Sequence, residues 1–117
     1  NVDRRKHVLS AYKIASCYYN LGEYSKLGVY LELGSKVLEI LNEDSPQYIV
    51  FSSNLANFYS CVNDYSNAIK FCLRALDVCK TINGDNHPDY IRLLDNLSKY
   101  YNNIGNCFYH NLLRMPN

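Results

Sequence analysis

The chain has 117 residues, enough for one domain that buries roughly 60–70% of its unfolded surface. Lys and Arg number 12 against 11 Asp and Glu, so the chain lacks the basic footprint of a nucleic-acid binder. No apolar run approaches the roughly 18 residues of a membrane span, and no signal-peptide pattern is present. We therefore expect neither nucleic acid nor membrane as a partner. Because the chain begins with Asn1 rather than Met, we expect an excerpt of a longer protein.

Apolar residues at helical spacing alternate with turn residues about every twenty positions along the chain. Gly22, Asn63 and Gly105 stand at matching turn positions, where a residue that tolerates the left-handed conformation ends a helix. Pro88 suits the first turn of a helix, because its missing N–H has no partner there. In chain order the pattern predicts six helices: 4–21, 23–42, 46–62, 65–83, 88–104 and 107–114.

Each predicted helix has an apolar stripe that we expect to form its core face. Ala68 and Ala75 are small members of such a stripe, so we expect them at close helix–helix contacts. Gly34 aligns with Ala75 and predicts another close approach. The stripe of the first helix is Ile14, Ala15, Tyr18 and Leu21. That of the second helix is Tyr24, Leu27, Leu31, Gly34, Leu38 and Leu41. That of the fifth helix is Ile91, Leu94, Leu97, Tyr101 and Ile104.

The five cysteines form no CxxC pair and no zinc-like spacing. An odd number of cysteines in a helical chain favours reduced thiols and a reducing compartment, so we expect a cytoplasmic protein. Cys72 and Cys79 are seven residues apart on one helix face, which predicts that both fill core positions as small hydrophobic residues.

The helices also repeat as pairs, with a period of 42 residues. Pro46-Gln47-Tyr48-Ile49 returns as Pro88-Asp89-Tyr90-Ile91, and Asn54-Leu55 returns as Asn96-Leu97. A weaker copy lies 41 residues upstream of the middle unit. A period in this range indicates stacked supersecondary units rather than one globular core, and it directs the functional question from catalysis to binding.

The residues of the middle unit resemble the tetratricopeptide repeat. The residues that carry the resemblance are Leu55-Ala56, Tyr59, Asn63, Tyr65, Ala68 and Ala75-Leu76. The 42-residue unit, the linker at 83–88 and Asn54-Leu55-Ala56 are similar to the kinesin light chain subclass of that family. The resemblance implies an all-α, right-handed α-solenoid of antiparallel helix pairs. Its three repeats would span about 4–42, 46–83 and 88–114.

In such a solenoid the first helix of each pair lines the concave wall, where we expect an extended peptide to bind. The resemblance assigns Asn54 and Asn96 to the peptide backbone, because an amide both donates and accepts hydrogen bonds. The other expected binding residues are Tyr12, Lys13, Asn57, Arg92, Lys99 and Asn103. Three of these are cations, which favours a mildly acidic ligand. The alternative is that the amides are simply solvated or cap nearby backbone groups.

No catalytic constellation is present, because His7, His87 and His110 each lack a motif partner. No calcium-loop spacing or glycine-rich phosphate loop is present either, so we expect no cofactor and no enzymatic activity. The leading hypothesis is an adaptor or scaffold module, and the alternative is a peptide-sensing regulatory domain of a signalling enzyme or transcriptional regulator. The short sixth helix covers the third unit incompletely, so we expect a further repeat or a neighbouring chain there.

Overall fold

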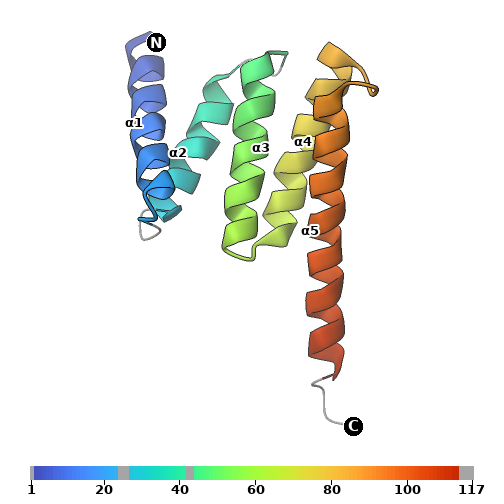
Figure 1. Ribbon diagram of the computed structural model, residues 1–117. Coiled ribbons are helices and arrows are strands. Elements are labelled where there is room, and N and C mark those ends of the chain that lie inside the picture. Colours follow the sequence, from blue (N-terminus) through green and yellow to red (C-terminus); the bar gives the residue numbers. More distant parts are fainter. Residues whose placement is uncertain (1, 24–26, 42–43, 114–117) are drawn as a thin grey trace.

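The protein is all-α in the part that the computed structural model describes, which is residues 2–23, 27–41 and 44–113. Residues 2–3 and 107–113 are described by their backbone alone. The helices are α1 (Val2–Asn20), α2 (Leu27–Ile40), α3 (Pro46–Cys61), α4 (Tyr65–Asn83) and α5 (Pro88–Leu113). Figure 1 shows them in chain order across the molecule, with α2 and α4 behind α1, α3 and α5. Each helix packs on the next in sequence, and α3 and α4 share the most extensive contact. This is the expected helical-repeat solenoid.

The turns between helices follow from particular residues. Ser45 caps α3, because its hydroxyl accepts a hydrogen bond from the Tyr48 N–H, and Pro46 occupies the first turn. Asn63 has a φ of 63°, the left-handed conformation expected where α3 ends. Asp64 then caps α4 by accepting a hydrogen bond from the Asn67 N–H at 3.3 Å.

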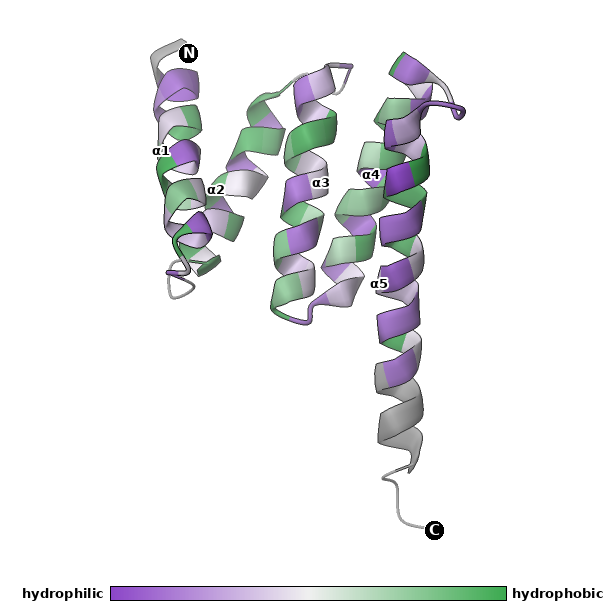
Figure 2. Ribbon diagram, in the orientation of Figure 1, coloured by the Kyte–Doolittle hydropathy of each residue, from purple (hydrophilic) through white to green (hydrophobic). Residues whose placement is uncertain are grey.

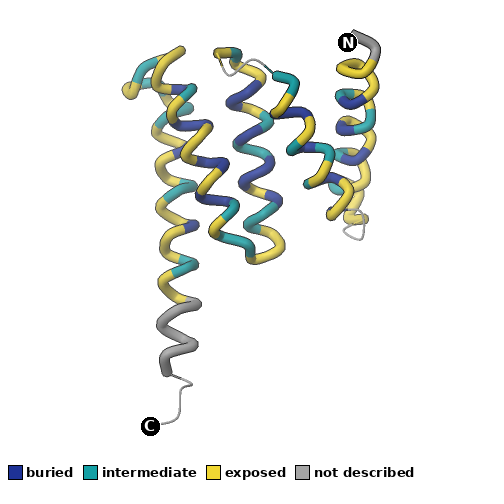
Figure 3. Tube along the Cα trace, turned by 180° about the vertical axis from the view of Figure 1, so that it is seen from behind, coloured by how far each residue is buried: buried dark blue, intermediate teal, exposed yellow. Residues whose placement is uncertain are grey.

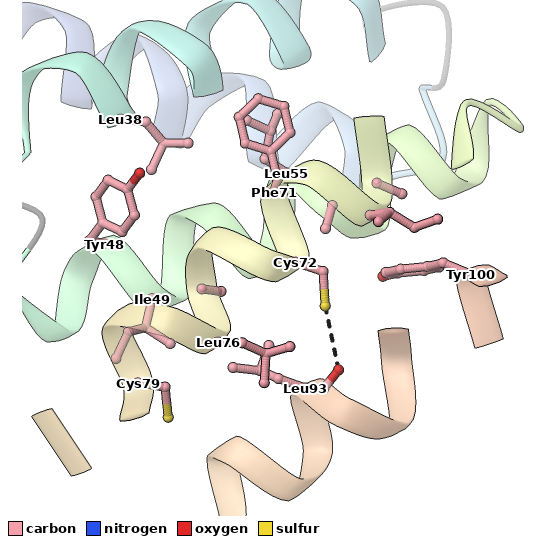
Figure 4. Packing of buried hydrophobic residues seen from close by; sticks show 14 residues of the cluster. Leu38, Tyr48, Ile49, Leu55, Phe71, Cys72, Leu76, Cys79, Leu93 and Tyr100 are labelled. Carbon is pink, nitrogen blue, oxygen red and sulfur yellow. Dashed lines mark hydrogen bonds between the residues drawn. The ribbon is translucent and has the colours of Figure 1, made fainter. Parts of the chain in front are cut away.

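The core divides into two clusters of buried residues. One cluster lies among α1, α2 and α3 and is largely aromatic, with Tyr30 and Phe58 in edge-to-face contact at 4.0 Å between ring centroids. The other lies mainly among α3, α4 and α5, includes Leu38 of α2, and contains Cys72 and Cys79 (Figure 4). The Cys72 thiol donates to the Leu93 carbonyl at 3.4 Å, which ties α4 to α5. Both cysteines are buried, as predicted.

Small residues lie where helices approach closely, as the sequence predicts. Ala68 and Ala75 are fully buried. A Cβ atom added to Gly34 would lie 3.0 Å from Leu55 Cδ1 and 3.5 Å from a ring carbon of Tyr12. The close neighbours of Gly34 are therefore side chains of α1 and α3. Gly28 has no atom within 4 Å of the added Cβ, and nothing in the structure explains it.

The prediction of a turn at Gly105 and a separate sixth helix at 107–114 is wrong. α5 runs without interruption from Pro88 to Leu113 and extends beyond the other helices (Figure 1). In the middle repeat a second helix can pack on α3 because Ala68 is small. The residue 42 positions after Ala68 is His110, so the third repeat lacks the small residue that a close second helix needs. The third repeat is therefore a single helix within the described residues.

The predicted core face of α1 is correct only at Ala15, because the helix is rotated about its axis relative to the prediction. Ala15 is buried, but Ile14, Tyr18 and Leu21 are 60%, 44% and 78% exposed. Val8 and Tyr12 are buried in their place. The rings of α2 and α3 explain the difference, because Tyr12 packs on Phe51 and Tyr19 packs on Phe58. Tyr18 and Tyr19 are adjacent in the sequence, so apolar spacing alone does not decide which of them faces inward.

The buried face of α5 is likewise rotated relative to the predicted stripe. Leu93 and Tyr100 are buried, while Ile91, Leu94 and Tyr101 remain exposed because none of the five described helices covers them. Figure 3 shows this arrangement from behind, with buried positions concentrated on α2, α3 and α4. In α2 the stripe is confirmed for Leu27, Gly34 and Leu38, and Tyr24 lies outside the described residues.

Candidate functional site

The binding residues predicted from the sequence, other than Tyr12, are polar and lie on α1, α3 and α5. On α3, Asn57 is exposed and Asn54 is half-buried, and on α5 the cations Arg92 and Lys99 are exposed. Figure 2 shows hydrophilic residues at intervals along the coloured part of α5 and in bands on α3. We call this surface the polar face and define it by the following residues: Lys13, Asn54, Asn57, Arg92, Asn96, Lys99 and Asn103.

Tyr12, which the sequence assigns to this surface, belongs to the core instead. Only 4% of it is exposed, and its hydroxyl accepts a hydrogen bond from the Tyr30 hydroxyl at 2.8 Å. Burial and the neighbouring Tyr30 raise the pKa of Tyr12 above its ordinary value, and an interaction with the Asn54 side chain lowers it in part. The Asn54 amide therefore lies near the Tyr12 hydroxyl, at the edge of the core of the first repeat.

Asn57 is held in place from the opposite side. Its side-chain oxygen accepts a hydrogen bond from the Tyr100 hydroxyl at 2.5 Å, which links α3 to α5. Desolvation raises the pKa of Tyr100 to about 12, so this hydroxyl remains a donor at neutral pH. The carbonyl group of Asn57 is thus occupied, and its N–H₂ group is the part that can contact a ligand.

Asn96 and Asn103 on α5 are half-buried, and within the described part of the chain neither side chain has a hydrogen-bond partner. Asn96 lies 42 residues after Asn54, so the repeat places an amide at the same position of two successive first helices. Amides at such positions can donate to and accept from the backbone of an extended chain.

The cations of the polar face are largely compensated by their own helix. Arg92 Nη2 lies 3.4 Å from Asp89 Oδ1, and Lys99 Nζ lies 3.3 Å from Asp95 Oδ2. Counting the sequence alone gives an excess of two positive charges, because only Asp95 is set against Lys13, Arg92 and Lys99. With Asp89 included, the excess falls to one.

A second candidate surface lies between α2 and α4, away from the polar face. It is a cavity of about 600 Å³ with Leu38, Tyr48 and Phe71 among its lining residues. The guanidinium of Arg74 lies 5.2 Å from the centre of the Phe71 ring, and Lys70 lies 5.5 Å from it. No motif in the sequence marks this cavity, because its lining residues come mainly from three different helices, α2, α3 and α4.

Comparison with known proteins decides the family. Residues 47–107 match the family model described as tetratricopeptide repeat, and this match covers more than half of the chain. The chain belongs to the tetratricopeptide repeat family. No match to it was found among curated proteins. Tetratricopeptide repeats generally mediate protein–protein interaction.

The described side chains of this tetratricopeptide repeat domain supply hydrogen-bonding and apolar groups. They contain no cluster of His, Cys, Asp or Glu that could hold a metal ion. Within the same described part, no helix is both long and apolar enough to cross a membrane. The polar face offers amide groups, one of which accepts a hydrogen bond from the buried Tyr100, and amides can donate to and accept from a protein ligand.

Proposed function

We propose that this tetratricopeptide repeat domain is a non-enzymatic adaptor or scaffold module that binds an extended peptide on its polar face. The observation that carries the proposal is the equivalent placement of Asn54 and Asn96. Both are half-buried on first helices one repeat apart, and the Asn54 amide lies near the Tyr12 hydroxyl. Successive amides at a fixed interval can bind the repeating backbone of an extended segment without dictating its sequence.

The remaining residues of the polar face would determine which kind of peptide binds. The N–H₂ group of Asn57 is oriented by Tyr100 and would donate to a peptide carbonyl. Lys13, together with the paired cations of α5, favours a mildly acidic segment. Arg92 and Lys99 are exposed and already paired with carboxylates, so they would increase the association rate and the selectivity more than the affinity. Added salt would weaken their attraction for the ligand.

The proposal also covers the subclass of the repeat and the cellular compartment. The 42-residue repeat and the linker at 83–88 support a kinesin light chain-like subclass, and the odd number of cysteines supports the cytoplasm as the compartment. The buried Cys72 and Cys79 have no disulfide partner, which agrees with a reducing compartment.

A peptide-display screen followed by substitution tests the proposal. Changing Asn54 and Asn96 together to Ala should weaken binding of a selected peptide by about 1–3 kcal/mol, since each net hydrogen bond contributes roughly 0.5–1.5 kcal/mol. The melting temperature should change little, because neither residue is fully buried. Asn86→Ala, which removes an exposed amide outside the polar face, is the matched control and should bind as the parent does.

The cavity between α2 and α4 provides the competing location. Arg74→Ala removes one of its cations without touching the polar face. If Arg74→Ala abolishes binding while the double Asn→Ala variant binds at full strength, the ligand lies in that cavity and the proposed polar-face site is wrong.

A further inference from the structure

The cavity between α2 and α4 has an apolar floor and a charged rim. Leu38, Tyr48 and Phe71 form the floor and are 7%, 4% and 7% exposed. The rim consists of four exposed, charged residues of the two helices: Glu39, Lys70, Arg74 and Asp77. An apolar floor with a few charged groups at its edge, in a volume of about 600 Å³, is typical of a site that binds a ligand.

The cavity exists because α2 and α4 do not pack extensively on each other. α2 packs on α1 and α3, whereas α4 packs on α3 and α5. Tyr48, in the first turn of α3, closes the space between them from below. Each wall is thus held by other helices of the domain, and the cavity is formed before any ligand arrives.

Two cations converge on one aromatic ring of this cavity. The Arg74 guanidinium lies 5.2 Å and the Lys70 ammonium 5.5 Å from the centre of the Phe71 ring. Contact with the ring helps to hold the guanidinium, whose planar set of donors matches a carboxylate. Within the described part of the chain neither cation forms an ion pair, in contrast to Arg92 and Lys99 of α5. The repulsion between the two like charges is therefore not offset by the domain itself, and a carboxylate of a ligand would offset it.

The two carboxylates of the rim lie toward its other end. α2 and α4 run in the same direction (Figure 1), Glu39 belongs to the last turn of α2, and Asp77 follows both cations along α4. Neither carboxylate forms an ion pair with a described residue. Lys70 and Asp77 are seven residues apart, which is about 10 Å along a helix. A ligand complementary to this rim therefore carries a carboxylate and a cation about 10 Å apart, with an apolar group between them.

We propose that the cavity between α2 and α4 is a second binding site, separate from the polar face, for a peptide segment of a partner protein. The segment has a large apolar residue with an acidic residue on one side and a basic residue on the other. Its apolar side chain packs on the floor, its carboxylate binds Arg74 and Lys70, and its cation lies toward Glu39 and Asp77. Each residue of an extended chain adds about 3.3 Å, so about three or four residues span the rim. A domain with both sites can hold two segments at once.

Selection from a random peptide display library on the whole chain carrying Asn54→Ala and Asn96→Ala tests this site apart from the polar face. The enriched peptides should contain an apolar residue flanked by an acidic and a basic residue. Adding Arg74→Glu should raise their dissociation constants about tenfold or more, because an attraction becomes a repulsion between like charges. Lys80→Glu makes the same change of charge at an exposed position of α4 outside the cavity, and it should leave the dissociation constants unchanged.

A second selection separates a change of the site from a loss of the fold. In the chain with Lys70→Glu and Arg74→Glu the rim consists of carboxylates alone, so the enriched peptides should carry basic residues and lack the acidic one. Circular dichroism confirms that each variant remains helical. The proposal is overturned if no peptide is enriched in the first selection, if the enriched peptides lack acidic residues, or if Arg74→Glu and Lys80→Glu have equal effects. It is also overturned if both selections enrich the same peptides.

Discussion

Gly34 and Gly105 allow the same substitution, Gly→Ala, to be made in two different environments. Both lie inside helices, so each substitution should gain up to about 1 kcal/mol of helix propensity. At Gly105 nothing lies within 4 Å of the new methyl group, and the gain should be retained. At Gly34 the methyl group would lie 3.0 Å from Leu55 Cδ1, and overpacking of this kind costs about 1–3 kcal/mol. We therefore expect Gly34→Ala to be about 1–3 kcal/mol less stable than Gly105→Ala, because the propensity gain cancels between them.

The comparison is made by thermal and urea denaturation followed by circular dichroism. For a domain of this size, 1 kcal/mol corresponds to roughly 3–6 °C in melting temperature, so the two variants should differ by at least about 3 °C. Repeating the melts at two protein concentrations separates any contribution from self-association, which would depend on concentration. If Gly34→Ala melts at or above the temperature of Gly105→Ala, the close contact of Gly34 with Leu55 does not limit the packing of α2.

Three further predictions follow from the described core. Ala75→Leu should destabilise the domain by about 1–3 kcal/mol, because Ala75 is fully buried; a melt indistinguishable from the parent would show that α4 is packed differently. Stability should fall as pH rises through about 10 to 12, because the unfolded chain loses the Tyr100 proton near the ordinary pKa of 10.0 and the folded chain keeps it to about 12. Tyr100→Phe should reduce that slope in alkaline melts. Iodoacetamide at neutral pH should label the exposed Cys17 and Cys61 before Cys72, whose pKa burial raises to about 11; mass spectrometry of timed samples would reveal a reversed order.

The middle of the chain could be predicted from sequence because local and tertiary signals agree there. Asn63 ends α3, Asp64 caps α4, and Ala68 and Ala75 supply the close contact. The ends could not be predicted as well. In α1 two adjacent tyrosines made the apolar spacing ambiguous, and only the rings of α2 and α3 select Tyr19 as the inward one. A helical period states which residues share a face but not which face another helix will cover.

In α5 the error comes from the alignment of the repeats. Gly105 aligns with Gly22 and Asn63, two left-handed turn residues, and the alignment therefore predicts a turn. A glycine permits a turn but does not require one, and α5 continues through Gly105 to Leu113.

For the candidate site, the repeat predicted polar positions on α3 and α5, of which Asn57, Arg92 and Lys99 are exposed and the remaining asparagines are half-buried. It could not show that Tyr12 is buried or that Asp89 pairs with Arg92. Such contacts depend on the rotation of each helix, which the neighbouring helices decide.

The contacts between helices have a consequence for how the domain opens. Since each helix packs mainly on its neighbours in sequence, α1 and α5 gain little from each other, and opening at one end need not spread to the other. Amide hydrogen exchange should therefore be slowest in α3 and α4 and faster toward both ends. A ligand lying across α1, α3 and α5 would bridge segments that the fold leaves independent. Ligand binding would slow amide exchange in α1 and α5 together. The helices would then open as one cooperative unit rather than independently at each end.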